Sequence, residues 1–138
     1  MRTLHFGLRV ADLERSLAFY AAVGYEVVGS VPDTPIGHLT MLKLPGDDFV
    51  TVELVFDPTK RDVQPGTGPH HFVVKVESVD ETVAELAAGG IEAEPPTSPD
   101  GSDDVRTTWI TDPDGNRIEL VQWPAGHPDG MTRADWPD

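Results

Sequence analysis

The stretch Asp112–Val121 reads DPDGNRIELV. Asp-Pro-Asp-Gly is a strong turn signal, because proline presets the second turn position and glycine accepts a positive φ angle. The residues that follow alternate, with Ile118 and Leu120 on one face of a predicted strand and Glu119 on the other. The turn therefore starts a strand that holds the carboxylate of Glu119 on the face opposite the main apolar row.

The same pattern occurs earlier in the chain at a constant distance. The sequence Glu53-Leu54-Val55 precedes Glu119-Leu120-Val121 by 66 residues, and His5 precedes His71 by the same 66 residues. A constant offset across both halves indicates that a structural unit has been duplicated.

Each half is predicted to follow the order β-α-β-β-β. In the first half a helix begins after the capping residue Asp12 and ends at Gly24, and the expected strands are residues 5–10, 25–31, 38–44 and 49–56. In the second half a helix runs from the cap Ser78 to Gly89, and the expected strands are residues 71–76, 91–94, 105–111 and 116–123. The polar, proline-rich residues 94–104 are expected to form an exposed loop.

These elements predict an α+β protein built from two βαβββ modules. The predicted division is a first module at 1–56, a linker at 57–69, a second module at 70–123 and a turn-rich tail at 124–138.

Composition excludes several classes of function. The 138 residues contain no cysteine, which excludes disulfides, thiolate zinc sites and a cysteine nucleophile. The formal net charge of −14 argues against nucleic acid and anionic membrane as partners, since both require positive charge. No apolar run is long enough to span a membrane and the N-terminus lacks an apolar signal core, so we expect a cytoplasmic protein.

The candidate site comes from the direction of side chains in the strands. Because alternate residues of a strand share a face, His5 and His71 are expected to point away from the apolar rows that the helices cover. Glu53 and Glu119 are expected on the same uncovered faces, so two modules facing each other would form a cup with two imidazoles and two carboxylates. His70 lies one residue out of register and is expected to point towards the helix side.

A divalent cation would stabilise such a cup. Two carboxylates about 4 Å apart repel each other by roughly 4 kcal/mol at an effective dielectric constant of about 20, and a doubly charged ion removes that repulsion. Two nitrogen and two oxygen ligands suit Ni, Co, Zn, Mn or Fe(II) and argue against Mg and Ca. Four protein ligands leave coordination positions open, which is typical of a catalytic metal.

Over nearly its whole length the sequence resembles glyoxalase I (lactoylglutathione lyase) of the vicinal oxygen chelate superfamily. The resemblance rests on motifs from both halves: His5 with Leu8-Arg9-Val10, the segment Ser16–Tyr20, Val52-Glu53-Leu54, the Gly68–His71 approach to the second module, and Asp112–Leu120. A histidine at position 5 in a short chain resembles the nickel- or cobalt-activated class more than the zinc class.

The resemblance implies an enzyme that acts on the hemithioacetal of methylglyoxal and a thiol such as glutathione, and yields an S-2-hydroxyacyl thioester. It implies that His5, Glu53, His71 and Glu119 bind the metal, with Glu119 as the group that transfers the proton and Glu53 as a partner base. It also implies a homodimer in which each site takes one His–Glu pair from each chain. Arg9 matches the position that contacts a glutathione carboxylate.

One departure from the family bears on the thiol. Where the family has an asparagine that helps to bind the glutamyl end of glutathione, this chain has Asp57, which would repel a carboxylate. A different low-molecular-weight thiol is therefore an open alternative. Two other functions stay open: a metal-free small-molecule (antibiotic) binding or resistance module, and an acyl-CoA epimerase, which the scarcity of Lys and Arg disfavours.

Overall fold

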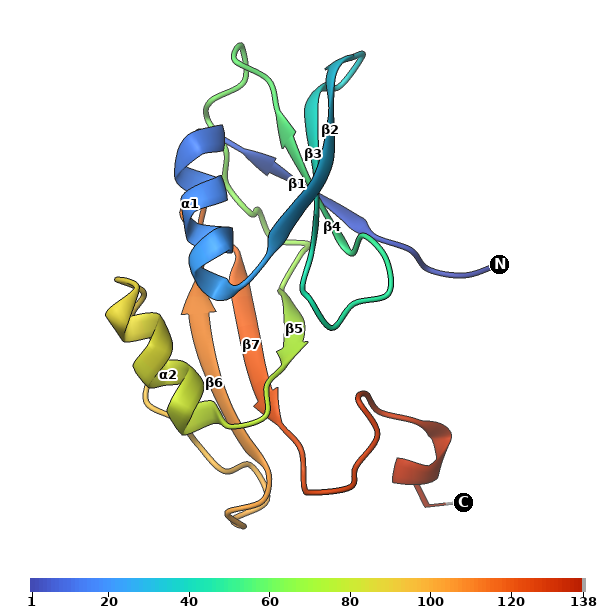
Figure 1. Ribbon diagram of the computed structural model, residues 1–138, viewed down its shortest axis with the longest axis vertical. Coiled ribbons are helices and arrows are strands. Elements are labelled where there is room, and N and C mark those ends of the chain that lie inside the picture. Colours follow the sequence, from blue (N-terminus) through green and yellow to red (C-terminus); the bar gives the residue numbers. More distant parts are fainter. Residues whose placement is uncertain (138) are drawn as a thin grey trace. The chain divides into compact units, whose positions relative to one another are not determined.

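A computed structural model of the chain describes residues 1–137, which divide into two units. The first unit comprises Met1–Gly68 together with Asp112–Gly115, and the second comprises Pro69–Thr111 together with the chain from Asn116 onward. Each unit contains a helix and a β-sheet, which confirms the predicted α+β class with two βαβββ-like modules (Figure 1).

The first unit is a four-stranded sheet with one helix. Its elements are β1 (Phe6–Val10), α1 (Leu13–Val23), β2 (Glu26–Thr34), β3 (Gly37–Lys43) and β4 (Val52–Phe56). The strand order is β1-β4-β3-β2, with β1 parallel to β4 and the other neighbours antiparallel. The last strand begins at Val52, three residues later than predicted, because Asp47 turns the preceding segment by accepting bonds from Leu44 N and Thr51 Oγ.

Helix α1 begins and ends where its capping residues predict. The side chain of Asp12 accepts a hydrogen bond from Arg15 N, and Gly24 follows the helix with a φ angle of 123°. Tyr20 on this helix is fully buried and packs edge to face against Tyr25. The core of the unit is completed by four fully buried strand residues: Val10, Leu42, Val52 and Leu54.

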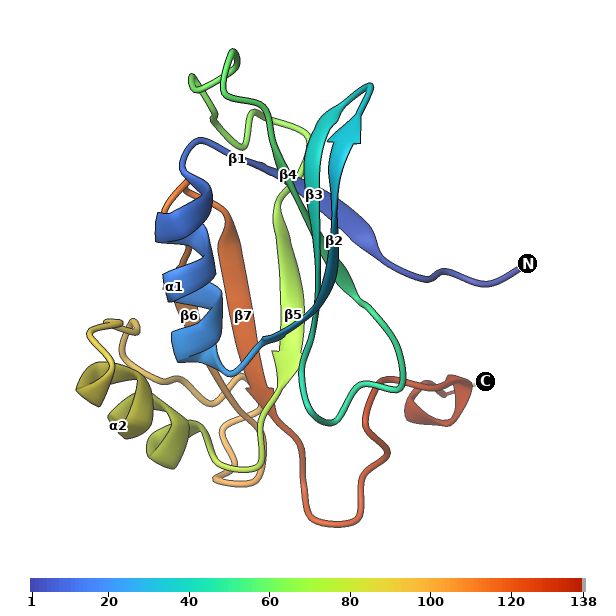
Figure 2. The ribbon, with the colours of Figure 1, turned by 45° about the horizontal axis from the view of Figure 1, so that its top comes forward.

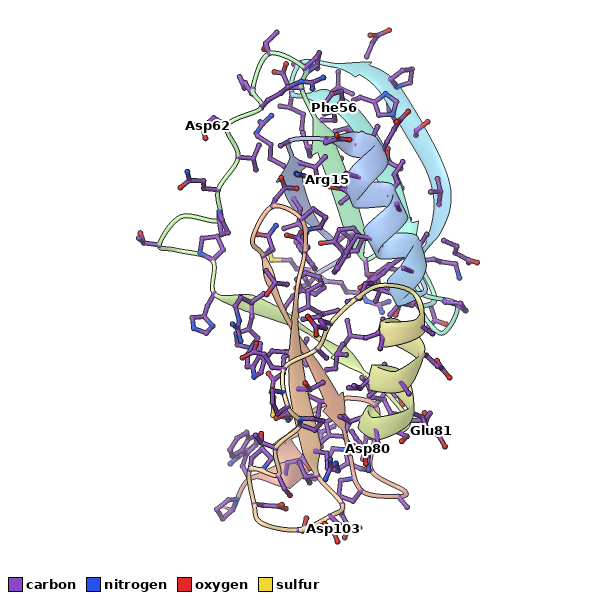
Figure 3. All side chains as sticks on the ribbon, turned by 90° about the vertical axis from the view of Figure 1, so that its left-hand side faces the viewer. Arg15, Phe56, Asp62, Asp80, Glu81 and Asp103 are labelled. Carbon is purple, nitrogen blue, oxygen red and sulfur yellow. The ribbon has the colours of Figure 1, made fainter. Side chains whose placement is uncertain are left out.

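The Asp-Pro-Asp-Gly turn belongs with the first unit, although the strands on either side of it belong to the second. Asp114 accepts hydrogen bonds from Ala11 N, Arg15 Nη2 and Ser16 Oγ, all at the start of α1. Figure 3 labels Arg15 at this end of the helix. Asp112 accepts a bond from the hydroxyl of Tyr20. Two nearly buried carboxylates are thereby supplied with donors, as buried charges require.

The second unit has a three-stranded sheet. Its elements are β5 (His71–Lys75), α2 (Val79–Ala88), β6 (Arg106–Thr111) and β7 (Arg117–Gln122), and a short 3-10 helix η1 (Arg133–Asp135) near the chain end. The strand order is β5-β7-β6, with β5 parallel to β7 and β6 antiparallel to it. Helix α2 runs beside β6 and β7 (Figures 1 and 2).

The N-terminus of α2 is fixed by caps and charge. Ser78 Oγ accepts a hydrogen bond from Glu81 N, and Val79 N donates to the side chain of Gln122 on β7. Asp80 in the first turn, labelled in Figure 3, forms a 2.8 Å ion pair with Arg106 on β6. The helix is therefore attached to its sheet at both neighbouring strands.

The predicted strand at residues 91–94 is wrong. That segment runs beside β6 with only scattered bonds: Glu94 N donates to Trp109 O, and Thr97 pairs with Thr107 in an isolated bridge. Pro95 lies between these two contacts and has no N–H to donate, so a regular ladder cannot form there. The loop predicted at residues 94–104 is mostly exposed, and it is bonded to β6 through Glu94 and Thr97.

No helix within residues 1–137 is long and apolar enough to cross a membrane. In the tail, Met131 and Trp136 keep 66% and 58% of their surface exposed, so neither side chain is buried against the rest of the second unit.

Candidate metal site

The first unit brings His5 and Glu53 together. Nε2 of His5 lies 3.5 Å from Oε2 of Glu53. Their side chains are 35% and 15% exposed, so the pair is partly shielded but reachable by a small molecule. The strand register places Gly7 beside Glu53 across β1 and β4, and His5 immediately precedes β1, two residues before Gly7.

The second unit repeats this arrangement. Nε2 of His71 lies 3.4 Å from Oε2 of Glu119, and the two side chains are 31% and 21% exposed. Here Val73 pairs with Glu119 across β5 and β7, and His71 is two residues before Val73. The parallel register is the same in each unit, and in each the histidine two residues before the partner of the glutamate lies beside that carboxylate, which is the neighbourhood that the sequence predicts.

Both pairs have the spacing expected for two ligands of one metal ion. Donor atoms about 2.1 Å from a tetrahedral ion are separated by roughly 3.4 Å. The observed separations of 3.5 and 3.4 Å match that value. Imidazole nitrogen and carboxylate oxygen also suit a transition metal better than Mg or Ca. The residues therefore fit a divalent metal.

Each unit supplies two ligands and no more. Within residues 1–137, neither unit by itself gathers three or more His, Asp or Glu side chains that could hold a metal ion. Sharing of one ion by the two pairs stays a prediction. A hollow of about 590 Å³ at the β2–β3 hairpin is lined by none of the four candidate ligands; it is bounded by Pro32, Asp33, Thr34, Pro35, Gly37, His38, Phe56 and Pro58.

The surroundings of His71 contain two residues that the sequence did not point to. Nδ1 of His71 lies 2.7 Å from Nδ1 of His70, and its ring meets that of Trp109 edge to face with centroids 4.9 Å apart. Trp109 is the partner of Glu119 in the antiparallel register, and Arg117 lies over its ring. The aromatic type of Trp109 and its place on the strand beside Glu119 could have suggested this contact.

His70 does not lie where the sequence predicted. Strand β5 begins at His71, so the rule that alternate residues point to opposite faces does not apply to His70. Its side chain is exposed, and its ring turns to meet that of His71.

Arg9 lies on β1, two residues beyond Gly7. Its Nη1 is buried and has no hydrogen-bond partner among the described residues. Nearby, Asp57 accepts hydrogen bonds from the backbone N–H and the hydroxyl of Thr59. These bonds, with smaller contributions from Lys60 and Arg9, hold the pKa of the Asp57 carboxyl below its usual range, so this side chain stays negatively charged.

Comparison with known proteins gives a family match over most of the chain. The family model of the Glyoxalase/Bleomycin resistance protein/Dioxygenase superfamily matches residues 2–120. A probable lactoylglutathione lyase of Vibrio cholerae is 30% identical over 130 residues, which cover 91% of this chain and 94% of the relative.

Two further similar proteins have names that describe other activities. A trivalent organoarsenical cleaving enzyme of Bacillus sp. (strain MD1) is 36% identical over 133 residues, which cover 87% of this chain and 72% of the relative. Among solved structures, an antibiotic-binding protein from Streptomyces sp. CB03234 is 26% identical with a TM-score of 0.67, and the match covers 91% of this chain and 99% of that one.

Proposed function

Because the chain belongs to the Glyoxalase/Bleomycin resistance protein/Dioxygenase superfamily, we propose that it is a metal-dependent lyase acting on the hemithioacetal of a 2-oxoaldehyde, such as methylglyoxal, and a low-molecular-weight thiol. The observation that carries the proposal is the repeated His–Glu pair, at 3.5 Å in the first unit and 3.4 Å in the second. A binding module that sequesters a small molecule has no need of two such pairs.

The proposed metal ligands are His5, Glu53, His71 and Glu119, with Ni or Co favoured and Zn, Mn or Fe as alternatives. Two carboxylates balance the charge of a divalent ion, and neutral imidazoles complete the set. We propose that the protein is a homodimer in which the first pair of one protomer and the second pair of its partner serve the same ion. The family resemblance supports this exchange.

The proposed reaction is an isomerisation that leaves the atoms in balance. When bound, the metal supplies Lewis-acid polarisation of two adjacent substrate oxygens. Glu119 removes the proton from C1 of the hemithioacetal and returns it to C2, while the hydroxyl proton on C1 passes to the oxygen on C2, which gives an S-2-hydroxyacyl thioester without any oxidant or reductant. Glu53, which occupies the corresponding position in the other pair, is the partner base.

Arg9 is the proposed contact for an anionic group of the thiol. A guanidinium nitrogen that is buried without a partner carries an unmet hydrogen-bonding capacity, which a carboxylate would satisfy. The ionised Asp57 opposes a second carboxylate in the same neighbourhood. This combination favours a thiol with fewer negative charges than glutathione.

Organoarsenical cleavage is the second candidate function, because the relative with that name shares 36% identity. Trivalent arsenic binds sulfur strongly, and this chain contains no cysteine to hold it. The arsenical would therefore have to be held by the metal ligands or by an external thiol alone, which makes this function the less favoured of the two.

A direct assay separates these functions. The protein is loaded with Ni or Co and supplied with methylglyoxal and a thiol. Parallel assays use glutathione and thiols that carry fewer negative charges than glutathione. We expect thioester formation that depends on the metal and is abolished by a chelator. Absence of thioester with every thiol would contradict the proposal, and release of inorganic arsenic from a trivalent organoarsenical would favour the second function instead.

A further inference from the structure

The two His–Glu pairs differ in what surrounds the histidine. Nδ1 of His71 is 2.7 Å from Nδ1 of His70, and the ring of Trp109 closes another side of the imidazole. In the first unit the position equivalent to His70 is Leu4, which precedes His5 and is largely exposed. A leucine side chain cannot hydrogen-bond to an imidazole, so only the second pair has this support.

The short contact requires a proton between the two rings. A separation of 2.7 Å between two nitrogens is a hydrogen-bond distance, and one Nδ1 must donate while the other accepts. Donor atoms about 2.1 Å from a tetrahedral ion lie roughly 3.4 Å apart, so two Nδ1 atoms 2.7 Å apart are placed as hydrogen-bond partners and not as two ligands of one ion. His70 is therefore a hydrogen-bond partner of His71 and not a fifth metal ligand.

The direction of this bond suits metal binding by the other nitrogen of His71. Nε2 is the atom that faces Glu119. For Nε2 to offer its lone pair to a metal, the proton of the neutral imidazole must be on Nδ1, where His70 can accept it. Metal-bound histidines in proteins are commonly oriented by such a partner on the second ring nitrogen.

We propose that His70 is a positioning residue that fixes the ring orientation and the tautomer of His71. Before a metal binds, the second His–Glu pair therefore already has its histidine oriented for coordination through Nε2, whereas the first pair lacks this support. This role rests on the proposed function, since it assumes that His71 binds a metal. It acts through His71 and involves no contact between His70 and the substrate.

Three variants test this role. His70→Leu gives the second pair the leucine that precedes His5, and His70→Asn keeps a polar atom close to the position of the lost Nδ1. His38→Leu, on β3, is the matched control because it removes an imidazole that belongs to neither pair. Thermal unfolding checks that all three remain folded.

The first measurement is metal affinity, determined by competition of Ni²⁺ with a coloured chelator. We expect His70→Leu to bind Ni²⁺ about 10- to 100-fold more weakly, as is usual when the partner of a metal-bound histidine is lost. His70→Asn should recover most of that loss, and His38→Leu should match the wild type. Equal affinity of wild type and His70→Leu would overturn the role of His70 while leaving the proposed function intact.

The second measurement uses the metal-free protein and does not depend on enzymatic activity. Long-range ¹H–¹⁵N NMR of the metal-free protein, at a pH where both rings are neutral, reports the tautomer of each histidine. We expect His71 to be protonated on Nδ1 and His70 on Nε2, which are opposite tautomers. Protonation of His71 on Nε2 would overturn the inference. A wild type that binds no Ni²⁺ but shows opposite tautomers would contradict the proposed function and retain the hydrogen bond.

Discussion

The hydroxyl of Tyr20 donates a 2.7 Å hydrogen bond to Oδ2 of Asp112, and both side chains are buried in the first unit. Ninety-two positions separate these residues in the sequence. The bond attaches the Asp-Pro-Asp-Gly turn to α1, and the strand that carries Glu119 begins shortly after that turn. The bond therefore holds this turn within the first unit.

Replacing Tyr20 by phenylalanine should destabilise the protein. The substitution removes a donor from a buried carboxylate, and a hydrogen bond to a charged group contributes about 1.5–3 kcal/mol. Chemical unfolding should show a loss of that size. Tyr25→Phe is the control, because it removes a hydroxyl from a neighbouring buried ring that is not bonded to Asp112. A larger loss for Tyr25→Phe would contradict this account.

Stability should fall at alkaline pH through the same tyrosines. Burial, and for Tyr20 also the carboxylate of Asp112, raises the pKa of Tyr20 and of Tyr25 well above the usual value of about 10. The folded state therefore holds protons that the unfolded chain releases. The contribution of each protonated tyrosine to the free energy of unfolding is complete below about pH 10. Above that pH it declines by up to about 1.4 kcal/mol per pH unit for each tyrosine. The free energy of unfolding of Tyr20→Phe should decline less steeply above pH 10 than that of the wild type.

The turn between β2 and β3 should tolerate no side chain at Gly37. This residue has a φ angle of 124°, and an added Cβ would lie 2.5 Å from the carbonyl oxygen of Phe56. Gly37→Ala should therefore cost at least about 1–3 kcal/mol of stability. Gly29→Ala is the control, since no atom lies within 4 Å of its Cβ position, and it should change stability by about 0.5 kcal/mol or less. Equal melting temperatures for the two variants would contradict the strain at Gly37.

Asp57 should limit the use of glutathione. Removing its charge relieves repulsion of a nearby carboxylate, so Asp57→Asn should raise kcat/KM for the glutathione hemithioacetal roughly three- to tenfold. Asp62→Asn, in the same linker and labelled in Figure 3, is the control for a general change of charge. An equal gain in both variants would show that the effect is not specific to position 57.

Glu119 should be indispensable for turnover. Glu119→Gln keeps the shape and removes the base, and loss of a positioned base costs about 10²- to 10⁴-fold in rate. Glu92→Gln is the matched control, because Glu92 also has a counterpart 66 residues earlier, Glu26, but belongs to neither pair. Full activity of Glu119→Gln with bound metal would refute the assignment of the base.

Exchange of pairs between protomers can be tested by mixing two inactive proteins. One carries His5→Ala with Glu53→Ala, and the other carries His71→Ala with Glu119→Ala. If each site takes one pair from each protomer, a mixed dimer has one complete site, and the mixture should regain up to about a quarter of wild-type activity, since half of the dimers are mixed. No recovery after co-refolding would show that both pairs must be in the same chain.

The sequence predicts the local geometry of the site because that geometry arises from neighbouring strands. The strand pattern and the 66-residue repeat indicate that His5 lies near Glu53 and His71 near Glu119, although His5 itself immediately precedes β1.

Other features depend on tertiary contacts or on interruptions that periodicity does not show. Residues 91–94 alternate in the manner of a strand, but two prolines follow directly and no regular ladder with β6 forms. His70 lies just before its strand, where alternation gives no direction. The docking of the Asp112–Gly115 turn on α1 joins distant parts of the sequence, and no local pattern predicts which helix receives it.

Metal content tests the central claim most directly: one His–Glu pair from each half together hold one divalent ion. Wild-type protein and the two double-alanine variants are dialysed with Ni²⁺, and bound metal per chain is measured by elemental analysis. We predict one ion per wild-type chain and little or none in either variant. Two ions per wild-type chain, or undiminished binding after loss of one pair, would contradict the shared site.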